Sequence, residues 1–193
     1  MPTNFDGRLR ALIEAHEGRV SFMYCDTAGI VTVGVGHAVF TADEASRLRF
    51  HHRTGIAPAS PAEISDEWAR VKSIRLGPCQ EGLAALFMPD DNITGLLYED
   101  LARFTQTISQ ELPHFAALPD DARLACFDIA FNCGSLHGWP KLRAAIAERD
   151  WASAARECFR PTLEPRIAGI ADAPNGQRNK DTRALFLACT QTV

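Results

Sequence analysis

The chain has 193 residues and a formal net charge of −4 at pH 7, with 46% hydrophobic and 23% charged residues. This length suits one domain with a substantial core, and the composition excludes a disordered chain. The acidic balance excludes a broad positive field that would draw the protein to an acidic polymer, and no apolar run approaches the ~18 residues of a membrane span.

The N-terminal segment predicts an amphipathic helix that ends at Glu17. Asn4 or Asp6 can cap this helix, and its apolar positions share one face at helical spacing. These positions are Leu9, Leu12 and Ile13, together with His16. The segment is charged and has no apolar stretch typical of a secretory signal, so we expect a chain made in the cytoplasm without a Sec signal.

A β-hairpin is predicted next, over residues 20–36. Residues 20–24 alternate between apolar strand formers and other side chains, residues 26–29 have turn chemistry, and the following residues are β-branched. Gly34 and Gly36 lie where the backbone must bend or be approached closely. The segment therefore predicts two short strands that follow directly on the first helix.

This layout places two carboxylates opposite each other. Glu17 lies at a helix end and Asp26 in the hairpin turn, nine residues later. Hydrolysis of a glycosidic bond requires an acid on one side of the scissile bond and a base or nucleophile on the other. The pair is therefore a candidate catalytic pair for a glycoside hydrolase.

The stretch from Glu17 to His37, EGRVSFMYCDTAGIVTVGVGH, resembles the signature of the phage-type (T4-like) lysozymes, the muramidases of glycoside hydrolase family 24. The match runs without a gap over 21 residues, and it is carried by Glu17-Gly18 and by Tyr24-x-Asp26-x-x-Gly29-x-x-Thr32-x-Gly34-x-Gly36-His37. The resemblance implies that Glu17 is the general acid, that Asp26 is on the base side and that Thr32 helps to hold the water. It also implies a supporting role for His37 and a substrate contact for Tyr24.

A capping box at Thr41 and Glu44 predicts a short helix through Arg49. The basic side chains around its end favour a solvated helix face over contact with an anionic glycan. They are Arg47, Arg49, His51, His52 and Arg53. Residues 54–61 have the composition of a linker.

A further helix is expected to begin with Ser60 and Pro61 and to end at Gly77. Its predicted buried stripe consists of Ile64, Trp68, Val71 and Ile74. Compared with compact phage lysozymes, the region around residues 50–88 looks like an inserted helical segment.

The second half of the chain predicts mainly helices. A long one runs from Asp91 to about Leu112, and in the resembled fold this helix joins two lobes. A helix from Pro119 to Cys133, ended by Gly134, is apolar on most faces and so predicts a central buried helix. Shorter helices are expected at 140–148 and at 151–159 with Asp150 as N-cap, followed by a long loop at 160–177 and a last helix from Arg178 to about Cys189.

Two segments of this half also resemble the family. Phe131-Asn132-Cys133-Gly134 resembles an FNxG segment that reaches the groove, so Phe131 and Asn132 are expected to bind substrate, although Asn132 can equally be a helix C-cap. Arg178-x-x-x-Thr182-x-x-Leu185-Phe186 resembles the C-terminal helix whose first arginine pairs with the catalytic glutamate. The alternative for Arg178 is a surface arginine, and the second arginine often found beside it is Asn179 here.

The cysteines do not predict a disulfide scaffold or a metal site. Cys126 and Cys133 lie seven residues apart on one predicted helix, so their Cα atoms would be about 10 Å apart, too far for a disulfide. We expect both to be core thiols. The sequence has no CxxC and no HExxH pattern, so no metal is expected, and the resembled chemistry requires no cofactor.

The expected fold is α+β and mostly helical, a lysozyme-like two-lobed fold with a small β-hairpin lobe and a larger helical lobe around an active-site cleft. Residues 1–193 are expected to form a single lysozyme domain. Its small lobe covers about 1–90, with the hairpin at 20–36 and the inserted segment at about 50–88, and its helical lobe covers about 91–193.

The expected function is hydrolysis of the β-1,4 bond between N-acetylmuramic acid and N-acetylglucosamine in peptidoglycan, with inversion. The alternatives are a lytic transglycosylase, which uses one glutamate and no base, and a murein-binding module without catalysis. Expected partners are peptidoglycan glycan strands and an immunity (inhibitor) protein or a secretion-machine carrier, with no nucleic acid, and the chain is expected to be a monomer. As an endolysin released by a holin, or as an injected antibacterial effector, it would act in the periplasm.

Overall fold

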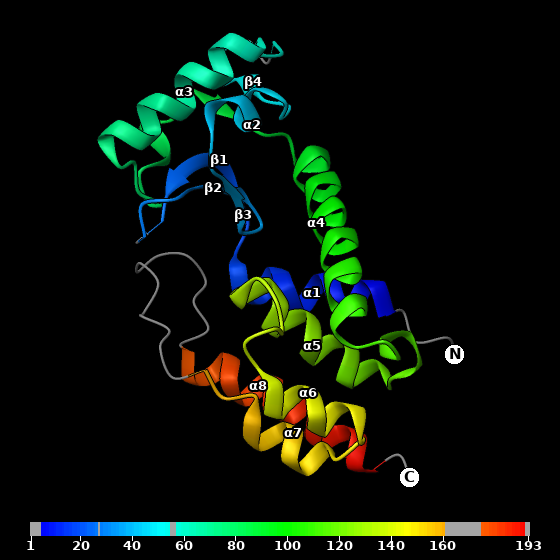
Figure 1. Cartoon of the computed structure of the whole chain (residues 1–193). Helices are drawn as coiled ribbons and strands as arrows, with labels where there is room; N and C mark the ends of the chain where they lie inside the picture. Colours follow the sequence, from blue (N-terminus) through cyan, green and yellow to red (C-terminus); the bar gives the residue numbers. More distant parts are fainter. Residues whose placement is uncertain (1–4, 27, 55–56, 161–174, 192–193) are drawn as a thin grey trace. The chain divides into compact units, whose positions relative to one another are not determined.

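The computed structural model describes residues 5–26, 28–54, 57–160 and 175–191 of the chain. These residues form two compact units. The sheet unit contains the described residues of 17–100, and the helical unit contains those of 5–16, 101–160 and 175–191. The chain passes from one unit to the other within two helices, α1 (Phe5–Glu17) and α4 (Asp90–Glu111) (Figure 1).

The sheet unit is built on a three-stranded antiparallel sheet in the order β1-β2-β3. The strands are β1 (Val20–Cys25), β2 (Val31–Gly34) and β3 (His37–Val39), and Tyr24 is paired with Thr32. The predicted hairpin is confirmed. The third strand was not predicted, and it forms because the chain reverses at once after β2, where Gly34 and Gly36 have positive φ angles of 66° and 69°.

The rest of the sheet unit is α2 (Ala42–Ser46), β4 (His51–His52), α3 (Pro61–Ile74), the 3₁₀ turn η1 (Glu81–Leu83), β5 (Leu86–Phe87) and the first half of α4. The predicted capping box of Thr41 with Glu44 is present, and the predicted helix start at Ser60 and Pro61 is confirmed, with a second capping box formed by Ser60 and Glu63.

Two details of this region differ from prediction. The short helix ends at Ser46, and His51 and His52 are in strand β4, paired with β5, so they do not belong to a solvated helix face. Phe50, just before the strand, is fully buried, and β4 and β5 form a separate two-stranded sheet.

Helix α3 also ends earlier than predicted. Arg75 adopts a left-handed conformation (φ 52°), and the N–H of Leu76 donates to the carbonyl of Val71 at 3.2 Å. Leu76 is fully buried after this turn, as expected for a Schellman-type helix end, whereas Ile74 is 51% exposed. Ile74 was therefore wrongly predicted to be buried, and Gly77 does not end the helix.

The helical unit consists of α1 up to His16, the second half of α4, and the helices that follow. They are η2 (Phe115–Ala117), α5 (Asp120–Cys133), α6 (Pro140–Ala147), α7 (Trp151–Glu157), α8 (Asn175–Ala188) and η3 (Cys189–Gln191). Almost every residue of α5 from Ala122 to Ala130 is buried, which confirms the central buried helix. The last helix begins at Asn175, three residues before the predicted start, and most of the predicted loop at 160–177 lies outside the described residues.

The two thiols on α5 differ in their surroundings. Cys126 is fully buried, and burial raises its pKa far above the ordinary value. Cys133 is exposed at the end of the helix, so the prediction of a core thiol is wrong there. Neither thiol forms a disulfide with another described cysteine, as the distance argument predicts.

Candidate active site

Glu17 is the last residue of α1 and is only 4% exposed. Its side chain packs against the backbone of the turn between β2 and β3. A Cβ atom built on Gly36 would lie 3.0 Å from Oε2 of Glu17 and 3.4 Å from its Cβ and Cδ atoms. A glycine at this position therefore allows the carboxyl to approach the turn closely, and its positive φ suits glycine as well.

Asp26 follows strand β1 and closes the turn that leads into β2. Its Oδ1 accepts the backbone N–H of Ile30 at 2.8 Å, and its own backbone N–H donates to the carbonyl of Ile30 at 2.9 Å. These bonds fix the carboxylate to the turn. Within the described part of the chain, Oδ2 has no hydrogen-bond donor, so this oxygen can accept a proton or a hydrogen bond from water.

Thr32 lies in β2 directly opposite Tyr24 of β1, and both side chains are buried. Residues paired in this way project from the same face of the sheet. The Thr32 hydroxyl is 3.4 Å from the carbonyl of Ile30, the residue that also bonds Asp26. Asp26 and Thr32 are thus linked through one turn residue.

His37 has a partner that the sequence did not reveal. Its Nδ1 lies 2.8 Å from Oδ2 of Asp100, a buried carboxylate on α4. This contact joins β3 to the long helix inside the sheet unit. The supporting role predicted for His37 in catalysis remains a prediction.

The predicted substrate-binding residues of the helical unit lie in the last turn of α5. The ring of Phe131 packs on Phe104 with centroids 5.0 Å apart, and the Asn132 side chain is half-buried. Gly134, with φ 83°, is the C-cap, so the alternative of Asn132 as a helix cap is wrong. The binding of substrate by Phe131 and Asn132 remains a prediction.

Arg178 is 3% exposed, which overturns the alternative of a surface arginine. Its Nε donates to Oδ1 of Asp128 at 2.8 Å, and its Nη2 donates to the Asp128 carbonyl at 3.1 Å. The predicted pairing of Arg178 with Glu17 remains a prediction.

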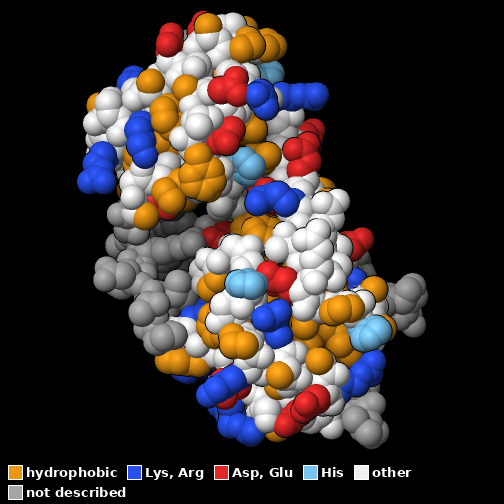
Figure 2. All heavy atoms as spheres, viewed as in Figure 1, with side chains coloured by type: hydrophobic (Ala, Val, Ile, Leu, Met, Phe, Trp, Pro, Cys, Tyr) orange, Lys and Arg blue, Asp and Glu red, His pale blue; other side chains and the backbone are white. Residues whose placement is uncertain are grey.

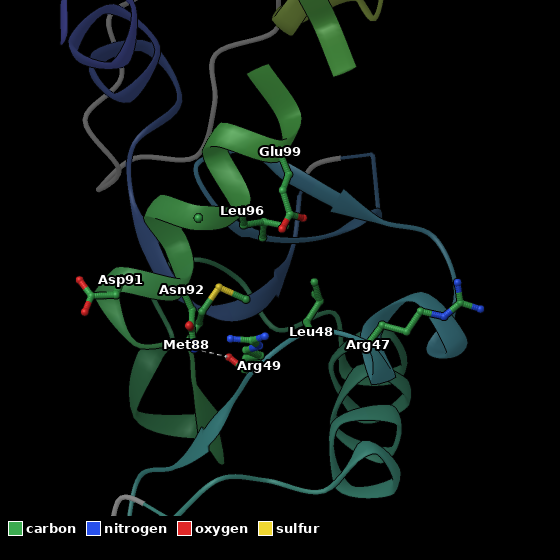
Figure 3. Close-up of a pocket in the computed structure, with 9 residues that line it drawn as sticks. Arg47, Leu48, Arg49, Met88, Asp91, Asn92, Leu96 and Glu99 are labelled. Carbon is green, nitrogen blue, oxygen red and sulfur yellow. Dashed lines mark hydrogen bonds between the residues drawn. The ribbon is translucent and has the colours of Figure 1, made fainter. Parts of the chain in front are cut away.

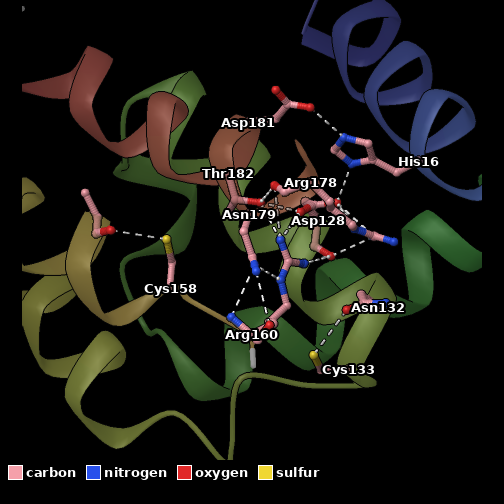
Figure 4. A network of polar contacts seen from close by, with 11 residues as sticks. His16, Asp128, Asn132, Cys133, Cys158, Arg160, Arg178, Asn179, Asp181 and Thr182 are labelled. Carbon is pink, nitrogen blue, oxygen red and sulfur yellow. Dashed lines mark hydrogen bonds and ion pairs between the residues drawn. The ribbon is translucent and has the colours of Figure 1, made fainter. Parts of the chain in front are cut away.

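Sequence reasoning missed Asp128 altogether. This residue lies on the central helix α5, is 0% exposed, and is bonded by His16, Arg160, Arg178 and Thr182 (Figure 4). The signal available in the sequence was an acid within an otherwise apolar helix, because a buried carboxylate requires partners.

A separate pocket of about 360 Å³ lies in the sheet unit, between residues 47–49 and the start of α4. Figure 3 shows Leu48 and Leu96 directed into it, with Arg47 and Asp91 directed outward. None of the predicted site residues lines this pocket. Its rim carries both signs of charge, and Arg47 is paired with Asp43, so it offers no uniform surface for an anionic polymer.

Charges of both signs are mixed over the face shown in Figure 2 as well. Within the basic cluster, Arg53 pairs with Glu81 at 3.0 Å and His52 with Glu63 at 3.3 Å. Acidic side chains thus lie beside several members of this cluster, so the structure gives no support for its contact with an anionic glycan.

Among the residues that the structure describes, no group of His, Cys, Asp and Glu side chains is arranged to hold a metal ion. Over the same residues, no helix combines the length and apolarity needed to cross a membrane.

Comparison with known proteins identifies the fold and the family. No curated protein matches the chain. Among solved structures, a mutant of P22 lysozyme matches with a TM-score of 0.51 and 20% identity over 97% of each chain, so the two share a fold. This confirms the predicted lysozyme-like α+β architecture. The model of the phage lysozyme family matches residues 14–165, which is more than half of the sequence, and the chain therefore belongs to the phage lysozyme family.

Proposed function

We propose that this protein is a peptidoglycan hydrolase, a muramidase that cleaves the β-1,4 bond between N-acetylmuramic acid and N-acetylglucosamine. The observation that carries the proposal is the ungapped pattern of Glu17, Asp26 and Thr32 in a chain that matches the phage lysozyme family. The burial of Glu17 against Gly36 and the fixed carboxylate of Asp26 support it.

In the proposed reaction Glu17 donates a proton to the oxygen of the leaving sugar as the glycosidic bond breaks. Asp26 takes a proton from a water molecule that attacks the anomeric carbon from the opposite face, and Thr32 holds that water by its hydroxyl. This arrangement inverts the anomeric centre. It requires the two carboxyl groups to be roughly 6.5–9.5 Å apart, whereas direct attack by Asp26 would require about 5–5.5 Å.

The other predicted residues have auxiliary roles in this proposal. Arg178 orients Glu17, His37 supports the hairpin, and Tyr24, Phe131 and Asn132 contact the glycan. Residues 1–193 act as one lysozyme domain and as a monomer, without a metal or organic cofactor. The biological settings that we propose are an endolysin released by a holin, or an injected antibacterial effector with a carrier and an immunity protein.

The main rival is a lytic transglycosylase, which forms a 1,6-anhydro end without water. The carboxylate of Asp26, held by the backbone N–H of Ile30, and the buried hydroxyl residue Thr32 favour hydrolysis, because a transglycosylase requires no base to activate water. Mass spectrometry of the fragments released from purified peptidoglycan tests this directly. Reducing ends that incorporate one water molecule are expected, and anhydro ends would contradict the proposal.

A further inference from the structure

Asp128, which was not among the predicted site residues, has four side-chain hydrogen-bond donors. Its Oδ1 accepts hydrogen bonds from Nδ1 of His16 and from Nε of Arg178, each at 2.8 Å. Its Oδ2 accepts from Nη2 of Arg160 at 2.8 Å and from the hydroxyl of Thr182 at 2.5 Å. Both oxygens of this fully buried carboxylate are thus bonded twice.

The imidazole of His16 is held on both sides. Nδ1 faces Asp128, and Nε2 lies 3.2 Å from Oδ2 of Asp181 on α8. A carboxylate only accepts hydrogen bonds, so both ring nitrogens must carry protons to satisfy both contacts. The geometry therefore favours the charged imidazolium, which is buried and bound between two acids.

These contacts of His16 fix the C-terminal turn of α1. His16 is the residue before Glu17 in the last turn of α1, and its two partners lie on α5 and α8. Arg160, which follows α7, is bound to the same carboxylate. The C-terminal turn of α1 is consequently tied to the centre of the helical unit by hydrogen bonds to a single charged side chain.

We propose that His16 and Asp128 are positioning residues for the proposed general acid: by holding the last turn of α1, they fix the backbone from which Glu17 projects. This inference rests on the proposed function. A general acid must be held in place to transfer its proton, and a misplacement of about 1 Å can reduce a rate by roughly 100-fold.

The anchor depends on the proton of His16. Burial acts to lower the pKa of His16, but the hydrogen bond and charge of Asp128 and the hydrogen bond of Asp181 outweigh burial and the charge of Arg178, so this pKa is raised. A raised pKa means that the anchor is intact at lower pH and is released as the pH rises through the His16 value. The contribution to turnover should follow the same titration.

The test compares His16→Gln with the wild-type protein from pH 5 to pH 9, with kcat and KM measured on soluble peptidoglycan fragments. His114→Gln is the matched control, because His114 is exposed and its side chain has no partner among the described residues. The pKa of His16 is measured separately from its ring proton by NMR. The ratio of wild-type to variant kcat at each pH then reports the contribution of His16 to turnover.

The expected ratio is about 10 to 100 below the His16 pKa, falling to one above it, with little change in KM. The control should match the wild type at every pH. Two results would overturn the inference. One is a kcat ratio near one at every pH, and the other is a ratio that does not change with pH and is explained by a smaller folded fraction of the variant. If Glu17→Gln were as active as the wild type, the proposed function itself would fail, which separates the two cases.

Asp181→Asn provides a second variant in case His16→Gln does not fold. The side chain of Asp181 is 38% exposed, so its replacement leaves the buried core of the network in place. The variant should lower the His16 pKa and shift the loss of kcat to lower pH by the same amount. A shifted His16 titration with an unchanged kcat profile would contradict the inference.

Discussion

Replacing Gly36 by alanine tests the contact between the proposed acid and the sheet. The new methyl group would lie 3.0 Å from Oε2 of Glu17 and 3.4 Å from its Cδ, so the carboxyl must move by a few tenths of an ångström. The positive φ of 69° adds strain of roughly 1–2 kcal/mol for a residue with a Cβ atom. We expect the free energy of unfolding to fall by about that amount and kcat to fall roughly tenfold.

Gly34→Ala is the control that separates these two effects. Gly34 has nearly the same φ, 66°, but a methyl group there would be 3.5 Å from Ile93 and 3.8 Å from Leu96, which are ordinary contacts. Both variants should lose similar stability in urea unfolding followed by circular dichroism. Only Gly36→Ala should lose turnover of purified peptidoglycan at saturating substrate. Equal kcat values for the two folded variants would refute the contact as a determinant of Glu17 geometry.

The remaining predictions concern stereochemistry and stability. The first-formed product, followed by proton NMR before mutarotation, should be the α-anomer, and a β-anomer would instead indicate a covalent intermediate at Asp26. Asp128→Asn should lower the free energy of unfolding by about 3–5 kcal/mol near neutral pH, because it leaves buried cations without their carboxylate, and a loss below about 1 kcal/mol would contradict that view. Burial acts to raise the pKa of Asp128, but its hydrogen bond to His16 and the charges of Arg178 and Arg160 outweigh burial and hold this pKa well below its usual range. The free energy of unfolding of the wild type should therefore decrease as the pH falls toward the pKa of Asp128. It should also decrease as the pH rises through the raised pKa of His16, and His16→Gln should lack this alkaline decrease.

Local patterns were sufficient to predict the elements that carry the proposed acid and base. Alternation, a turn at Asp26 and two glycines specify the hairpin within a few residues of its observed strands. The capping box at Thr41, the helix start at Ser60 and the N-cap at Asp150 are likewise predicted from neighbouring residues, and all three are present in the structure. In these cases the interaction that decides the structure lies within four residues in the sequence.

Features that depend on distant partners could not be predicted. His16 was interpreted as one more position on an apolar face, because its partner Asp128 is 112 residues away. His51 pairs with Phe87, and strands of two residues have no periodicity to detect. Arg75 in the left-handed conformation has no sequence signal either, since glycine is the usual residue there.

The central claim is that Glu17 acts as the acid in hydrolysis of peptidoglycan. Glu17→Gln keeps the size of the side chain and removes the proton donor, so the most direct measurement is the rate at which this variant solubilises purified peptidoglycan. We predict a loss of roughly 100-fold or more, with an unfolding transition close to that of the wild type. A folded Glu17→Gln protein that solubilises peptidoglycan at the wild-type rate would contradict the account.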